Sequence, residues 1–177
     1  MQRIILVDYN AKWPKFFEEE KKLLLKSIGQ FVEQIEHIGS TSIPDLSAKP
    51  VIDILIGVHS LAAADAQCIE PIKKLGYRHV FQYEREFPFR RYFTKNSLQG
   101  GRRTHQIHLI ETTHPWFKRH IMFRDYLRAH PSERIAYEQF KRQLVRRFTN
   151  TNNYADAKTD FIKEIEAKAL EWHNSTL

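Results

Sequence analysis

A glycine followed by three hydroxyl residues is the part of the sequence best suited to holding a phosphate group. Gly39 comes after an alternating stretch that predicts a strand, and Ser40, Thr41 and Ser42 follow it directly. Because glycine lacks a Cβ, its backbone can approach a ligand closely. Hydroxyl groups and exposed backbone amides are hydrogen-bond donors for phosphate oxygens. We therefore predict a phosphate-binding turn at these four residues.

A single carboxylate, Asp53, interrupts an otherwise apolar and largely β-branched segment, residues 51–58. That segment predicts a central strand covered on both faces. A carboxylate among isoleucines is costly unless it is paired, hydrogen-bonded or bound to a metal. If Asp53 lies beside the turn of residues 39–42, a divalent ion could bridge it to phosphate oxygens. The alternative is a structural aspartate that pairs with Lys49 or with an arginine.

The elements that must position these residues alternate between strands and helices in the first part of the chain. Apolar residues at a period of two, or in short continuous runs, predict strands, and those at a period near 3.6 predict helices. The predicted strands cover residues 31–38, 51–58, 77–83, 91–95 and 105–111, with a further strand or extended arm at 4–7, and the predicted helices cover residues 13–28 and 61–75.

The remainder of the chain has helical patterns only. Helices are predicted over residues 116–129, 132–148, with Ser132 as N-cap, and 154–173. Mixed elements followed by helices indicate the α+β class. We expect a single domain over residues 1–177, with an α/β core at about 1–112 and a helical part at about 113–177.

The charge balance favours an anionic partner. The net charge is +7, from 28 basic and 21 acidic residues. This charge suits a nucleotide, RNA or another phosphate compound as partner, or it serves only solubility.

No apolar stretch approaches membrane-spanning length, so no membrane partner is expected. The first residues lack the long apolar core of a signal peptide, and a cytoplasmic location is expected. The single cysteine, Cys68, excludes an internal disulfide and a CxxC zinc site.

Several segments of the chain resemble the signature of the GrpB family. The resemblance is carried first by Glu-His-Ile-Gly-Ser-Thr-Ser-Ile-Pro at residues 36–44 and by Ala-Lys-Pro-Val-Ile-Asp-Ile at residues 48–54. The later matches, in the same order as in the family, are the segments 103–109 and 123–131, followed by Tyr137, Lys141, Tyr154, Lys158 and Phe161-Ile162. The resemblance spans almost the whole chain, and several ordered motifs make it specific.

The resemblance implies a nucleotidyltransferase-like fold of the polymerase-β type, a mixed sheet flanked by helices. In that superfamily a Gly-Ser turn grips the nucleotide phosphates, and an Asp-x-Asp pair on a following strand binds magnesium. Gly39, Ser40 and Asp53 match these positions, whereas Leu55 replaces the second aspartate. A third carboxylate of the family, on a later strand, corresponds to His108. Magnesium bound through Asp53 is the expected cofactor, but its clamp is incomplete.

The activity that the resemblance implies is transfer of a nucleotidyl group from a nucleoside triphosphate to an unidentified acceptor. Asp53 would be the metal ligand and a catalytic residue, with Glu36 or His108 as the base. The residues expected to hold the phosphates are Gly39, Ser40, Thr41, Ser42, Lys49, Arg103 and Lys158.

Two other classes of function stay open. Leu55 is consistent with a non-catalytic module that binds a nucleotide or RNA. GrpB-like domains also occur fused to dephospho-CoA kinase, which implies an accessory role or a link to coenzyme A metabolism. Arg90 and Arg91 lie among aromatic residues, a pattern that can stack a base or bind single-stranded RNA. It also describes an ordinary strand packed on a core. The basic residues near Lys141 are typical of a solvated helix face.

Overall fold

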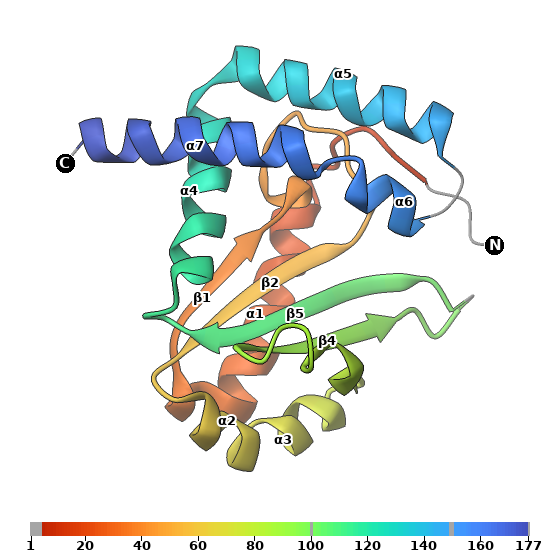
Figure 1. The fold of residues 1–177 in the computed structure, drawn as a ribbon. Coiled ribbons are helices and arrows are strands. Elements are labelled where there is room, and N and C mark those ends of the chain that lie inside the picture. The colour runs from red at the N-terminus through yellow and green to blue at the C-terminus, as the bar shows by residue number, and fades with distance from the viewer. Residues whose placement is uncertain (1–4, 100, 149–150, 177) are drawn as a thin grey trace.

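A five-stranded mixed sheet forms the centre of the computed structural model, which describes residues 5–99, 101–148 and 151–176 (Figure 1). The strand order is β1-β2-β5-β4-β3, in which β2 and β5 are parallel and the other neighbours are antiparallel. The strands are β1 (Val32–Ile38), β2 (Ile52–Val58), β3 (Arg78–His79), β4 (Arg90–Asn96) and β5 (Arg103–Glu111).

Three helices pack on one face of the sheet and close the main core. They are α1 (Trp13–Ile28), which lies behind the sheet in Figure 1, α2 (Leu61–Gln67) and α3 (Ile69–Lys74). The apolar stripe of α1 packs on alternate residues of β2, where Ile54 and Ile56 are fully buried. Because these residues face α1, Asp53 lies on the opposite face of β2, which points away from α1.

The helix predicted over residues 61–75 is divided in two. Pro71 has no amide hydrogen to donate to the carbonyl of Gln67, and its ring would clash with that carbonyl. The helix therefore ends at Gln67, and α3 begins after Cys68.

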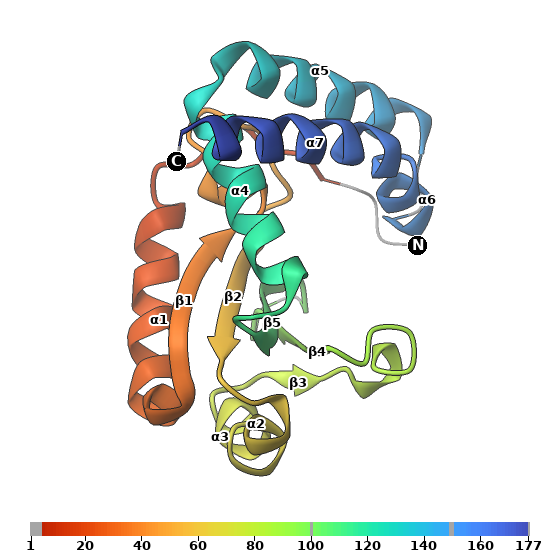
Figure 2. The same cartoon turned by 60° about the vertical axis from the view of Figure 1, so that its left-hand side comes forward.

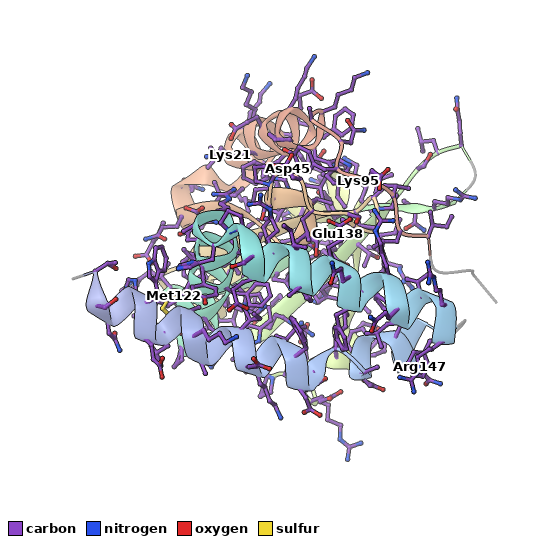
Figure 3. The ribbon with its side chains drawn as sticks, turned by 90° about the horizontal axis from the view of Figure 1, so that it is seen from above. Lys21, Asp45, Lys95, Met122, Glu138 and Arg147 are labelled. Carbon is purple, nitrogen blue, oxygen red and sulfur yellow. The ribbon has the colours of Figure 1, made fainter. Side chains whose placement is uncertain are left out.

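Four C-terminal helices follow the sheet, of which the first runs down beside the strands and the other three lie across one end of the sheet (Figures 1 and 2). They are α4 (Pro115–Ala129), α5 (Pro131–Arg147), α6 (Thr151–Asp156) and α7 (Thr159–Ser175). Figure 3 shows α5 and α7 side by side, and Tyr137 of α5 packs with Ile165 of α7 in a second core. The segment 154–173 is thus two helices. α5 begins at Pro131, a residue suited to the first helical position, and Ser132 is not its N-cap.

The α+β architecture with a helical C-terminal part is as predicted. At the N-terminus, where residue 4 lies outside the described residues, Val7 forms an isolated bridge with Ala48. The predicted strand at residues 77–83 is shorter, because only Arg78 and His79 pair with β4. Within the described part of the chain, no helix combines the length and apolar character needed to cross a membrane.

Candidate phosphate-binding site

The turn after β1 lies directly against Asp53. Gly39 has a φ of +69°, in the left-handed region that favours glycine. A Cβ built on Gly39 would lie 2.9 Å from the Cγ atom of Asp53, so the turn backbone contacts the carboxylate. Asp53 also lies opposite Ile38, the last residue of β1, in the sheet register. The two sequence motifs therefore converge at one point.

Two of the three hydroxyl groups in the turn donate to backbone carbonyls of the protein itself. Thr41 Oγ1 donates to the carbonyl of Val51 at 3.1 Å, and Ser42 Oγ donates to the carbonyl of Gly39 at 2.6 Å. Both side chains are buried. Thr41 and Ser42 therefore shape the turn, whereas Ser40 is partly exposed and remains accessible to a ligand.

A buried lysine supports the turn from α5. Lys141 Nζ donates to Ser40 Oγ at 3.1 Å and to the carbonyl of Ser47, and it lies 4.7 Å from the ring centroid of Tyr137. Its side chain is 2% exposed. Burial, with a smaller effect from Lys158, lowers the pKa of Lys141 to about 7. Whether Lys141 carries a positive charge behind Ser40 therefore depends on its burial and on the charges around it.

Gln106 of β5 is the cross-strand neighbour of Asp53. Its Nε2 group donates to Asp53 Oδ1, and its Oε1 atom accepts from Tyr92 Oη at 2.6 Å and from Arg103 Nη1 at 3.4 Å. Because Arg103 can only donate, the amide oxygen must face that side and the amide nitrogen must face Asp53. The network fixes Gln106 as a hydrogen-bond donor to the carboxylate.

Three cations surround this carboxylate. Lys49, Arg103 and Lys158 all lower the pKa of Asp53 through their charge. The Nζ atoms of Lys49 and Lys158 lie 4.6 and 4.7 Å from the ring centroid of Tyr154, so both ammonium groups contact one aromatic ring. Among the residues described, Asp53 has no basic nitrogen within 4.0 Å of its oxygens. The cations are therefore near it but are not bound to it.

Burial shifts the pKa values of Asp53, Lys49 and Lys158, and repulsion between cations adds to the shifts of the two lysines. Burial raises the pKa of Asp53 to about 6, against the hydrogen bond from Gln106 and the three cations. Burial, with a smaller effect from the charge of Lys49, lowers the pKa of Lys158 to about 8. The pKa of Lys49 is lowered by burial and then by Arg103. One carboxylate among three cations leaves a positive surplus, which an anionic ligand would relieve.

Glu36 is tied to a helix. Arg124 of α4 donates to Glu36 Oε2 at 2.6 Å, to the carbonyl of His37 at 3.0 Å and to Asp125 at 2.8 Å. The arginine is buried, and the ion pair joins α4 to β1. A carboxylate held in this way is not a free base.

His108 lies on the same sheet face as Asp53 but one residue pair further along, opposite Leu55. Its ring contacts Tyr92 and Trp116, with centroid distances of 5.2 and 5.3 Å. Burial lowers its pKa well below the ordinary histidine value. The register thus gives the position beside Asp53 to Gln106, and the role of His108 in the site stays a prediction.

The residues around Asp53 do not fit a magnesium site. Leu55, at the second aspartate position, is fully buried. Gln106 presents its amide hydrogens to the carboxylate, and the other nearby polar groups include three cations. Across the described ranges, no group of three or more His, Cys, Asp and Glu side chains is placed to hold a metal ion. Mg²⁺ prefers several oxygen ligands in octahedral geometry, which this donor set does not supply.

Sequence reasoning missed Gln106 and Tyr92 and misplaced Lys141. The pairing of β5 with β2 has no local signal, so the partner of Asp53 could not be identified from its own segment. Lys141 was predicted on a solvated face. The spacing of Tyr137, Lys141 and Leu144 places all three on one helix face, and this was the available signal for its burial.

Comparisons with known proteins agree on one family. The family model described as GrpB protein matches residues 3–168. The glutamate-rich protein GrpB of Alkalihalophilus pseudofirmus is 37% identical over 164 residues, which cover 92% of this chain and 93% of that protein. The UPF0157 protein YqkA of Bacillus subtilis is 41% identical over 97% of this chain, but the chain spans only 48% of that protein.

A dephospho-CoA kinase of Mycolicibacterium paratuberculosis is also similar, with 28% identity over 97% of this chain and 47% of the kinase. Among solved structures, the crystal structure of the conserved protein GrpB from Enterococcus faecalis matches with a TM-score of 0.84 and 34% identity. The match covers 96% of this chain and 99% of that one. This likeness fits the nucleotidyltransferase-like α+β fold. Taken together, the family model, the relatives and the solved structure show that the chain belongs to the GrpB family.

Proposed function

We propose that this chain binds the phosphates of a nucleotide, or of a related phosphate compound, at the site around Asp53. The observation that carries the proposal is the convergence of Lys49, Arg103 and Lys158 on one carboxylate beside the Gly39 turn. All of these residues are at least partly open to solvent. The site is therefore accessible and has more positive than negative charge.

A phosphate chain matches the chemistry of this site. Charge-assisted hydrogen bonds from lysine and arginine to phosphate are stronger than neutral ones. Lys49 and Lys158 are partly desolvated and repel each other, and an anion between them would relieve both effects. Ser40 adds a hydroxyl group, and Lys141 supplies charge behind it.

The donor set supports binding in which cationic side chains take the place of a metal. Nucleotidyl transfer with Mg²⁺, as the fold resemblance implies, would need oxygen ligands beyond Asp53. Leu55 and Gln106 do not supply them. We therefore propose phosphate binding without a metal-dependent transfer step. The similarity to dephospho-CoA kinases adds dephospho-CoA to the ligands to be tested.

The test is a thermal-shift screen followed by calorimetric titration, because ligand binding raises apparent stability. The ligands are inorganic triphosphate, the four nucleoside triphosphates and dephospho-CoA, each with Mg²⁺ or with EDTA. We expect phosphate compounds to bind in EDTA. Lys158→Gln keeps most of the side-chain volume and should weaken binding about tenfold, the effect of one charge-assisted contact.

The matched control is Lys15→Gln. Lys15 forms an exposed ion pair with Glu19 on α1, which packs on the sheet face opposite Asp53, and its loss should leave the affinity unchanged. No binding by any phosphate compound, or equal weakening by both substitutions, would contradict the proposal.

A further inference from the structure

Arg90 and Arg91 are neighbours on β4 but lie in opposite environments. Arg91 donates two hydrogen bonds to Asp65, at 2.6 and 2.7 Å, and packs on the side of the sheet that α2 covers. Arg90 lies opposite Ile110 in the register, which places it on the face that carries Asp53. Within the described residues, Arg90 forms no ion pair. Of the two arginines, Arg91 alone has an ion-pair partner among the described residues.

Arg90 is held by aromatic rings. Its Cζ atom lies 4.7 Å from the ring centroid of Phe87, 5.1 Å from that of Tyr92 and 5.7 Å from that of Trp116. Its Nη1 atom is 3.4 Å from His108 Nδ1. Its Nε atom is buried and has no hydrogen-bond partner among the described residues. The side chain as a whole is partly exposed, so an acceptor on a ligand can approach the terminal nitrogens of the guanidinium.

A hollow of about 480 Å³ opens beside these rings. Phe87 and Trp116 contact Arg90 and also line the hollow, together with Phe89 and Arg119. The volume is in the range of small-molecule sites, which are lined mainly by aromatic and apolar side chains with a few polar groups. The composition favours a flat, partly polar ligand.

Tyr92 lies between Arg90 and the site around Asp53. Its hydroxyl group donates to Gln106, which in turn donates to Asp53. Its ring faces Arg90 and contacts His108. Arg90 and the site around Asp53 are therefore neighbours on one sheet face.

We propose that this hollow is a nucleobase subsite, so that the ligand of this chain is a nucleotide whose base stacks on Trp116 and Phe89 and accepts hydrogen bonds from Arg90. Aromatic rings stack on the π-face of any base, and arginine is a common donor to base acceptors. The inference rests on the proposed phosphate site, because the base is placed relative to phosphates bound near Asp53.

Calorimetric titration of the full chain in EDTA tests the inference. The ligands are inorganic triphosphate, each of the four nucleoside triphosphates, the corresponding nucleosides and a single-stranded oligonucleotide. At least one nucleoside triphosphate should bind about tenfold more tightly than inorganic triphosphate, the contribution of one stacked base. Arg90→Gln and Trp116→Ala should remove this preference and leave the affinity for inorganic triphosphate unchanged.

Two further variants keep the test decisive. Trp116→Phe retains an aromatic ring and should retain most of the preference, even if Trp116→Ala fails to fold. Arg78→Gln removes an exposed charge on β3, away from the hollow, and should leave the preference unchanged.

Each contrary result has a distinct meaning. If all nucleoside triphosphates bind no better than inorganic triphosphate, or if Arg90→Gln keeps the preference, the base subsite is overturned and the phosphate site stands. If nucleosides bind but inorganic triphosphate does not, the base subsite is supported and the proposed phosphate site fails. If the oligonucleotide binds more tightly than every mononucleotide, the ligand class is wrong and the inference is overturned. If nothing binds, both proposals fail.

Discussion

Two carboxylates on the same sheet face, Glu36 and Asp53, have opposite relations to the cations near them. Arg124 contacts Glu36 directly at 2.6 Å and bonds two further groups, so its charge is fully used within the protein. Asp53 is near several cations, yet its bonded partner is the neutral amide of Gln106. A paired charge joins two elements of the fold, whereas unpaired charges of one sign remain available to a ligand.

The largest expected effect is on protein stability and concerns Glu36, the carboxylate that is paired with Arg124. Arg124→Ala leaves Glu36 and the carbonyl of His37 without their partner, and breaking a buried pair should lower the free energy of unfolding by about 3 kcal/mol. Urea denaturation monitored by tryptophan fluorescence measures this loss. A loss below about 1 kcal/mol would mean that the ion pair is not a structural tie.

On the unpaired side, Asp53→Asn should raise the free energy of unfolding at pH 7 by about 1 kcal/mol, because the ionised carboxylate is desolvated and has no bonded cation. Asparagine can still accept the hydrogen bond from Gln106. Parallel urea titrations of both proteins measure the difference. If Asp53→Asn destabilises the protein as strongly as Arg124→Ala, the distinction between the two carboxylates fails.

The pH dependence of that same difference is a sharper test. The ordinary pKa of Asp53 is 3.8, and burial raises it to about 6 in the folded state. Between these values the folded state binds more protons than the unfolded state, so this group contributes stability at low pH that is lost as pH rises from about 4 to 6. The advantage of Asp53→Asn should therefore grow over this window and level off above it. An advantage that does not change with pH would contradict the raised pKa.

A smaller effect is expected for magnesium binding, and it tests whether Gln106 is the residue that keeps the site from fitting Mg²⁺. Gln106→Glu places a second carboxylate beside Asp53, and the variant should gain stabilisation by Mg²⁺ of about 0.5 to 1 kcal/mol at millimolar concentration. Thermal shift with and without EDTA measures this gain. Gln67→Glu, at an exposed position on α2, is the control and should show none. Equal responses of the original chain and Gln106→Glu would show that Gln106 does not decide metal binding.

The elements of the fold were more predictable than the contacts of the site. The boundaries of α1 and β2 follow from local periodicity, and the Gly39 turn from residue type. The prediction of one helix over residues 61–75 missed the division at Cys68, for which Pro71 was the available signal because it removes a helical hydrogen bond.

Partners distant in the sequence were not predictable. Gln106 meets Asp53, and Arg124 meets Glu36, through strand register and helix packing that join segments 53 and 88 residues apart. No local pattern encodes which polar residue faces which across a sheet. For this reason the sequence could indicate Glu36 as a base and His108 as a site residue, although one is ion-paired and the other lies in an aromatic cluster.

The most direct measurement is calorimetric titration of inorganic triphosphate into the original chain and into Asp53→Asn, in EDTA and again in Mg²⁺. If cationic side chains hold the phosphates, triphosphate binds in EDTA, and Asp53→Asn binds it about threefold or more tightly because a repelling negative charge is gone. If triphosphate binds only with Mg²⁺ and Asp53→Asn abolishes that binding, Asp53 is a metal ligand and the metal-free account is contradicted.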